Sequence, residues 1–137
     1  MEPAVGEYEL QISSYRDLRV WQDAMEIAQA CYALTIAFPK EETFGMTAQI
    51  RRASASIAAN IAEGHGRDNT GSFVQFLRIA QGSLKELETH VILAQRVGLT
   101  RSNGSDALLG RCEELGKMLR SLIRSLQRKA SADRSVA

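Results

Sequence analysis

The sequence predicts an all-α protein, an antiparallel up-and-down four-helix bundle, and three observations support this prediction. First, the composition of the 137 residues is near the globular average, with 45% hydrophobic and 24% charged residues and only 2 prolines and 10 glycines. Second, apolar residues recur in alternating steps of four and three over four segments, which is the spacing of one helix face. Third, the connections between these segments are short, so consecutive helices are expected to be antiparallel neighbours.

The first predicted helix runs from about Asp17 to Phe38, where Pro39 prevents a further helical turn. Its core positions are Val20, Ala24, Ile27, Cys31, Leu34 and Phe38. The second predicted helix runs from about Thr47 to Glu63, and the glycines at 64 and 66 are natural residues to end it. Its core positions are Ile50, Ala53, Ile57 and Ile61.

The third predicted helix follows a cap at Asn69 or Thr70 and continues to Val97, before a glycine. Its core positions are Phe73, Leu77, Ala80, Leu84, Leu87, Val91 and Ala94. A turn-rich segment over 100–105 ends in Ser105, the expected N-cap of a fourth helix from Asp106 to about Lys129. Its core positions are Leu108, Cys112, Leu115, Leu119, Leu122 and Leu126. The bundle is therefore predicted to span 15–130, between tails at 1–14 and 131–137.

A second apolar row accompanies the core positions of the first and third helices. A helix with two apolar faces usually buries the second face against another surface. One interpretation is that a wide core absorbs Trp21, Tyr32 and Phe76. The other is self-association into a homo-oligomer, with an interface formed by Trp21, Met25, Tyr32, Phe76, Ile79 and Leu93.

Charge is distributed unevenly although the net charge is only +1. Residues 101–137 carry eight basic and four acidic residues. Arg120, Arg124 and Arg128 follow at steps of four and form one ridge, one turn after Lys117. Like charges at this spacing repel one another, so the ridge favours a polyanionic partner. The candidate contacts to RNA or DNA are Arg51, Arg52, Arg67, Lys117, Arg120, Arg124 and Arg128. A solvated helix face and an acidic protein partner are the alternatives.

No pattern for catalysis or for a cofactor is recognisable. The two histidines, His65 and His90, lack the Glu-x-x-His spacing of di-iron bundles, although Glu86 and His90 can pair at i,i+4. Cys31 and Cys112 are far apart in the sequence and are predicted to be reduced core residues. We therefore expect a protein that is not an enzyme and that holds no metal.

Neither a secretion signal nor a membrane span is predicted. The first 13 residues are acidic and lack an apolar centre, which a signal peptide requires. The longest apolar stretch, Ile27 to Phe38, is far shorter than the ~20 residues of a membrane-spanning helix. These features predict a soluble, cytoplasmic protein.

Four segments resemble a known protein family. They are YRDLRVWQDAMEIA (15–28), FPKEETFGMTAQIRRASASIAANIAEGHGR (38–67), SFVQFLRIAQGSLKELETHVILAQRVG (72–98) and LGKMLRSLIRSLQ (115–127). They are similar to the four helix bundle protein, or 23S rRNA intervening-sequence protein, family. The chain departs from the family at Ala58, where proline is frequent.

The resemblance implies a four-helix bundle that assembles as a ring-like homopentamer. It also implies relatedness to the accessory protein of diversity-generating retroelements, which pairs with a reverse transcriptase and nucleic acid through a basic surface. Two functions follow as expectations. The first is a non-enzymatic oligomer that binds RNA or DNA, and the alternative is a scaffold that docks a protein such as a polymerase or reverse transcriptase.

Overall fold

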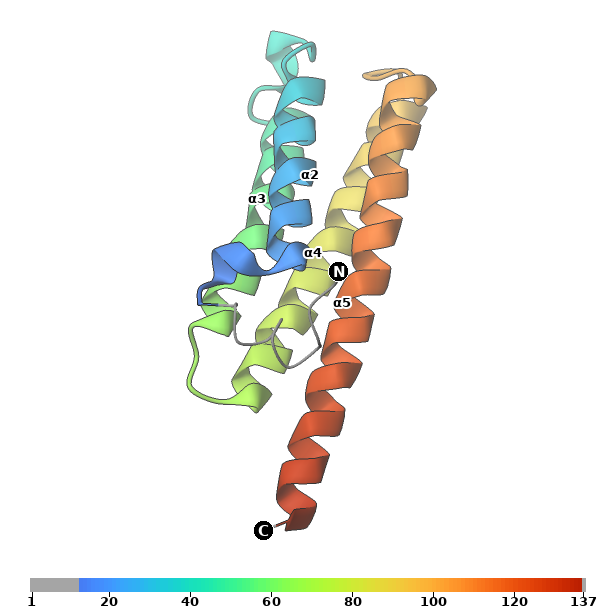
Figure 1. The fold of residues 1–137 in the computed structure, drawn as a ribbon. Helices are drawn as coiled ribbons and strands as arrows, with labels where there is room; N and C mark the ends of the chain where they lie inside the picture. Colours follow the sequence, from blue (N-terminus) through green and yellow to red (C-terminus); the bar gives the residue numbers. More distant parts are fainter. Residues whose placement is uncertain (1–12, 137) are drawn as a thin grey trace, which may run out of the picture.

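A computed structural model describes residues 13–136, the last two by their backbone alone. Four long α-helices and two short 3₁₀ helices make up this part of the chain, which contains no strand (Figure 1). The elements in order are η1 (Tyr15–Asp17), α2 (Arg19–Thr35), η2 (Lys40–Glu42), α3 (Met46–His65), α4 (Thr70–Arg96) and α5 (Ser102–Val136).

The four helices stand at the corners of a square. Helix α2 packs against α3 and α5, and α4 packs against the same two helices. No contact joins α3 to α5 within the described residues, so these two helices are diagonal neighbours. Helix α5 is the longest, and in Figure 1 its C-terminal part extends past the connection between α3 and α4.

The core consists mainly of residues that the helical spacing predicted, although Ile123 of α5, which was not among the predicted positions, is also buried. The fully buried side chains include Ile27, Ile50, Ile57, Ile61, Leu77, Leu84, Leu87, Val91, Leu115 and Leu119. Ala58 is also buried, and α3 continues through it without interruption. Of the predicted core positions, Leu34, Phe73, Leu122 and Leu126 are only partly buried and pack against this cluster.

Both cysteines are buried free thiols, which confirms their predicted place in the core. Burial is the main cause that raises the pKa of Cys31 from 9.0 to about 11. Burial likewise raises the pKa of Cys112 from 9.0 to about 12. Both side chains are therefore thiols, not thiolates, at neutral pH.

Helix α2 ends three residues before the predicted end at Phe38. A residue that precedes proline is disfavoured in the α conformation, which excludes Phe38 from the helix. The last turn instead closes at Thr35, whose Oγ1 donates a 2.8 Å hydrogen bond to the carbonyl oxygen of Cys31. Phe38 remains buried, because a short turn brings it back toward the core.

The predicted start and end of the fourth helix are both wrong. Ser105 is not the N-cap, because α5 begins at Ser102 and Ser105 is fully buried inside it. Its hydroxyl donates a 3.0 Å hydrogen bond to the carbonyl oxygen of Arg101, and the burial of Ser105 outweighs the turn preference of the segment. At the other end, α5 continues to Val136 through residues that were predicted to be a tail. The predicted tail over 1–14 lies mostly outside the described residues.

Two glycines mark helix contacts and ends. Gly64 does not end α3, which continues to His65. A Cβ atom at Gly64 would lie 2.5 Å from the Cβ of Phe76, so this glycine permits the close approach of α3 and α4. Gly98 has a φ of 82° directly after α4, a conformation that favours glycine, and it ends the helix as predicted.

Candidate nucleic-acid interface

Four basic residues of α5 form one continuous surface. Lys117, Arg120, Arg124 and Arg128 are exposed and line one shallow depression of about 310 Å³ together with Ser121. Each step of four residues advances ~6 Å along a helix. We call these four basic residues the α5 ridge. They face outward because the opposite side of α5 packs into the core.

The four cations of the α5 ridge differ in their partners. Lys117 Nζ lies 3.4 Å from Glu114 Oε1, which partly neutralises its charge. The three arginines form no ion pair or side-chain hydrogen bond with the part of the chain that the structure describes. Three guanidinium groups at adjacent turns are therefore available to an external anion.

Arg51 has an intramolecular role. Its Nε donates a 2.9 Å hydrogen bond to Thr35 Oγ1 on α2. Its guanidinium carbon lies 4.5 Å from the centre of the Tyr32 ring, in a cation–π contact. Arg51 thus links α3 to the C-terminal end of α2, and its side chain is directed at that helix.

The other two predicted contacts outside α5 have different environments. Arg67 Nη2 lies 3.0 Å from Glu63 Oε1, as the i,i+4 spacing suggests, and its guanidinium carbon lies 4.9 Å from the centre of the Phe76 ring. Arg52 is exposed on α3. Because α3 and α5 are diagonal, the seven predicted residues do not form one surface. Only the α5 ridge is contiguous.

The predicted interface residues divide into two groups. Met25, Tyr32, Ile79 and Leu93 are exposed large apolar side chains. Trp21 and Phe76 are half-buried. The Trp21 ring packs edge-to-face on Tyr15 at 5.3 Å, and Phe76 packs at the α3–α4 contact. The core thus absorbs part of the second apolar row, but not the four exposed members.

The exposed apolar residues lie on the two sides of α3. Tyr32 contacts Arg51 and therefore borders α3 from α2. On α4, Ser83 Oγ lies 2.9 Å from Ser56 Oγ of α3. Ile79 lies one turn before Ser83, on the same flank, and Leu93 follows Ile79 by 14 residues, about four turns. Both apolar rows therefore belong to one face of the molecule, centred on α3.

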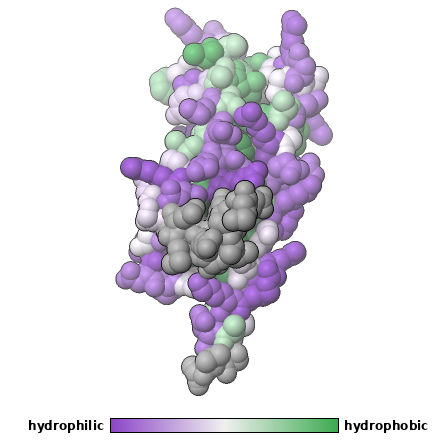
Figure 2. Space-filling view, viewed as in Figure 1, coloured by the Kyte–Doolittle hydropathy of each residue, from purple (hydrophilic) through white to green (hydrophobic). Residues whose placement is uncertain are grey.

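Phe44 is an exposed residue that the spacing of apolar residues did not identify. It lies in the connection between α2 and α3 and is 96% exposed, and Ile36 at the end of α2 is 81% exposed. Figure 2 shows hydrophobic residues gathered in the upper part of the view, toward this end of the molecule. The feature of the sequence that could have identified Phe44 is an aromatic residue within a short connection between two helices.

The described residues hold no group of three or more His, Cys, Asp or Glu side chains that could bind a metal ion. Glu86 Oε1 and His90 Nε2 lie 3.5 Å apart, and the imidazole nitrogen has no hydrogen-bond partner among the described residues. No helix within the described residues is both long and apolar enough to cross a membrane.

These features define the class as a small four-helix protein with a cationic ridge on one helix and an apolar face opposite to it. The family model of the 23S rRNA-intervening sequence protein matches residues 16–121. The chain belongs to this family, as the sequence resemblance indicated.

A solved structure supports the same assignment. The chain is similar to a protein of unknown function from the S23 ribosomal protein family of Bacteroides thetaiotaomicron, with 26% identity and a TM-score of 0.69. The similarity covers 76% of this chain and 97% of that one. No curated protein gives a significant match.

Proposed function

We propose that the protein is a non-enzymatic accessory protein that binds the phosphate backbone of RNA or DNA and acts as a homo-oligomer. One observation carries the first part of this proposal. Arg120, Arg124 and Arg128 lie at successive turns of α5, are exposed, and have no acidic partner among the described residues. Guanidinium groups bind phosphate in a bidentate manner.

The composition of the α5 ridge favours backbone binding over base recognition. The residues that line its depression are four cations and one serine, without an aromatic side chain. Stacking on unpaired bases requires aromatic rings, so the ridge offers charge and little sequence readout. Binding should therefore depend strongly on salt, because each phosphate contact releases counterions.

The test is a titration of a fluorescent single-stranded RNA at several salt concentrations. Three arginine contacts should give a slope of log K against log salt of about −2. The triple variant Arg120/Arg124/Arg128→Gln should reduce the magnitude of the slope by about 2 and bind about a hundredfold more weakly at 0.1 M salt. Arg52→Gln is the matched control and should bind like the wild type. A slope near zero for the wild type contradicts the proposal.

The second part of the proposal, self-association, is supported by the apolar face centred on α3. Met25, Tyr32, Ile79 and Leu93 expose apolar surface there, and family membership favours the ring-like homopentamer. The α5 ridge lies at the diagonal corner and would stay accessible in such a ring. Five copies would raise the net charge from +1 to about +5 and present each ridge several times.

Light scattering tests this assembly. The purified protein should have a mass several times 15.1 kDa, and Leu93→Glu should lower it toward the single-chain value. Ile92→Glu is a close control, because Ile92 is also exposed on α4 but lines the α4–α5 groove. A single-chain mass for the wild type at tens of micromolar, or equal masses for the two variants, argues against the α3-centred interface.

A second candidate function is a scaffold that docks another protein, such as a polymerase or reverse transcriptase. The exposure of Phe44 and Ile36 favours it, because exposed apolar anchors are typical of protein interfaces. The ridge would then contact acidic side chains. A pull-down that survives nuclease treatment but fails for Arg120/Arg124→Glu would favour this function over RNA or DNA binding.

A further inference from the structure

Helix α4 also presents basic side chains on the flank that faces α5. Lys85 of α4 and Arg120 of α5 line the same groove of about 590 Å³ between the two helices. Arg78 precedes Lys85 by seven residues, about two turns, and so lies on the same flank. Because α4 and α5 are antiparallel, moving from Lys85 back to Arg78 along α4 corresponds to moving from Arg120 toward Arg124 and Arg128 along α5.

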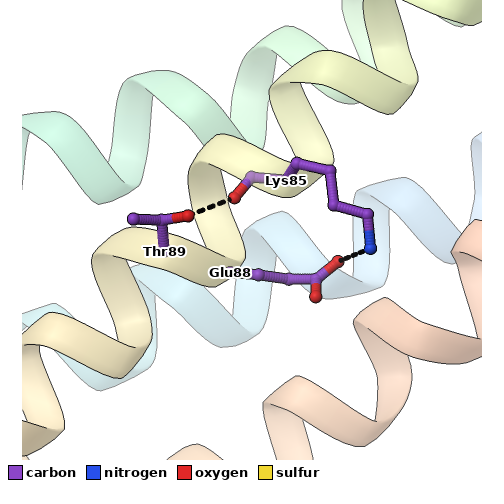
Figure 3. A network of polar contacts seen from close by, with 3 residues as sticks. All are labelled: Lys85, Glu88 and Thr89. Atoms are coloured by element: carbon purple, nitrogen blue, oxygen red, sulfur yellow. Dashed lines mark hydrogen bonds and ion pairs between the residues drawn. The ribbon is translucent and has the colours of Figure 1, made fainter.

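The charge of Arg78 is available, whereas that of Lys85 is not. Lys85 Nζ lies 3.2 Å from Glu88 Oε1, and Figure 3 shows both side chains on the same flank of α4. Arg78 is exposed and forms no ion pair or side-chain hydrogen bond with any residue in the described range. Nothing in the sequence drew attention to Arg78, because it is an isolated cation in its own helix.

The opposite end of the same groove is acidic. Asp106 and Glu113 of α5 line it there. Gln95 Nε2 donates a 3.1 Å hydrogen bond to Asp106 Oδ1, which fixes one carboxylate at this end. The surface shared by α4 and α5 is therefore cationic from Arg120 to Arg128 of α5 and anionic along the N-terminal half.

We infer that Arg78 forms a second row of the binding surface, so that a nucleic-acid strand lies along the seam between α4 and α5 and ends before Asp106. This inference rests on the proposed RNA or DNA binding. Packed helices lie ~8–10 Å apart, so arginines of both helices can contact phosphates of one strand. The acidic end repels phosphates and limits the strand to the cationic half. The ligand class is a phosphodiester backbone.

Arg96 provides a matched control for Arg78. It follows Arg78 by 18 residues, about five whole helical turns, and therefore points in the same direction from α4. It is also exposed, but it lies beside the acidic end of the seam. The variants Arg78→Gln and Arg96→Gln thus remove the same charge from the same helix face at opposite ends.

The experiment titrates both variants and Arg124→Gln with a fluorescent 20-nucleotide poly(U) strand over a series of salt concentrations. Arg78→Gln should reduce the salt slope by about 0.7 and weaken binding about fivefold at 0.1 M salt. Arg96→Gln should leave both quantities at the wild-type values. Arg78→Lys keeps the charge and should restore most of the slope, which excludes misfolding as the cause.

Three results would overturn the inference. If Arg124→Gln weakens binding but Arg78→Gln does not, α4 is not part of the site, while the proposed function stands. If Arg78→Gln and Arg96→Gln weaken binding equally, the effect is one of overall charge and not of the seam. If the wild-type protein shows no salt-dependent binding, the proposed function and the inference fail together.

Discussion

Helices α3 and α5 lie at diagonal corners of the bundle and expose different surfaces. Around α3, exposed apolar residues of α2 and α4 form a face, and Arg51 is held by Thr35 and Tyr32. On α5, the exposed side carries three arginines with no partner in the described part of the chain. The neighbourhood of an arginine therefore decides whether it stabilises the fold or is available to bind.

This difference separates the two proposed activities in space. An α3-centred interface leaves the α5 ridge free, and a ligand on the ridge leaves the apolar face free. Substitutions on one helix should accordingly affect one property without the other. The predictions that follow test this separation, from the largest expected effect to the smallest.

The first prediction concerns the core that both surfaces share. If both surfaces rest on one closed core, Cys31 of α2 and Cys112 of α5 should both be protected from reagents in the folded protein. With pKa values near 11 and 12, their thiolate fractions at pH 8 are about a hundredfold and a thousandfold below that of an ordinary cysteine. Iodoacetamide should therefore label both thiols of the folded protein at least about a hundredfold more slowly than it labels an ordinary cysteine.

The same pKa shifts predict how stability depends on pH. Both folded-state values lie above the unfolded value of 9.0, so the folded protein retains its protons longer. This contribution to stability is complete below pH 9 and is lost as the pH rises from 9 toward 11 and 12. Urea midpoints measured from pH 8 to 10.5 should fall, and Cys112→Ala should reduce the decline. A thiol that reacts rapidly at pH 8 would show that the core is open at that helix.

The second prediction compares a glycine of α3 with one of α5. Gly64→Ala places a Cβ atom 2.5 Å from that of Phe76 and should reduce the free energy of unfolding by about 2 kcal/mol. Gly110 of α5 has no atom within 4 Å of the same position. Gly110→Ala should therefore stabilise by about 0.5–1 kcal/mol through helix propensity. Equal effects in urea denaturation would show that α3 is not packed more closely than α5.

The third prediction exchanges one arginine on each helix for methionine. Arg51→Met removes the hydrogen bond to Thr35 and the contact with Tyr32, which should cost about 1 kcal/mol of stability. Arg124→Met should change stability by less than about 0.5 kcal/mol but reduce the salt slope of RNA binding. The separation of the two surfaces is contradicted if Arg51→Met lowers the salt slope as much as Arg124→Met does.

Helix positions and the core were predictable because they depend on the repeated burial of one face. Every large apolar side chain that is fully buried had the expected spacing along its helix. Helix ends were less predictable, because tertiary burial of Ser105 and the restriction before Pro39 compete with local preferences. Gly64 illustrates the limit: its sequence context suggests a helix end, but the reason for a glycine is the proximity of Phe76 on another helix.

The candidate site was predictable only where its residues lie on one helix. The α5 ridge follows directly from the spacing of 120, 124 and 128. The sequence could not show that Arg51 has an intramolecular role separate from the α5 ridge. Its partners Thr35 and Tyr32 lie on another helix. Arg78 was missed for the same reason, because its relation to the ridge depends on how α4 and α5 align.

Hydrogen exchange at the C-terminal end of α5 can show whether a ligand is bound to the α5 ridge. Near the end of α5, the side chains of 131–134 are all exposed, so this terminal turn frays more readily than the middle of the helix. Its amide protons should exchange with deuterium faster than those of the middle of α5. A strand anchored at Arg128 would damp that fraying, so exchange rates at the helix tip would record binding in the unmodified protein.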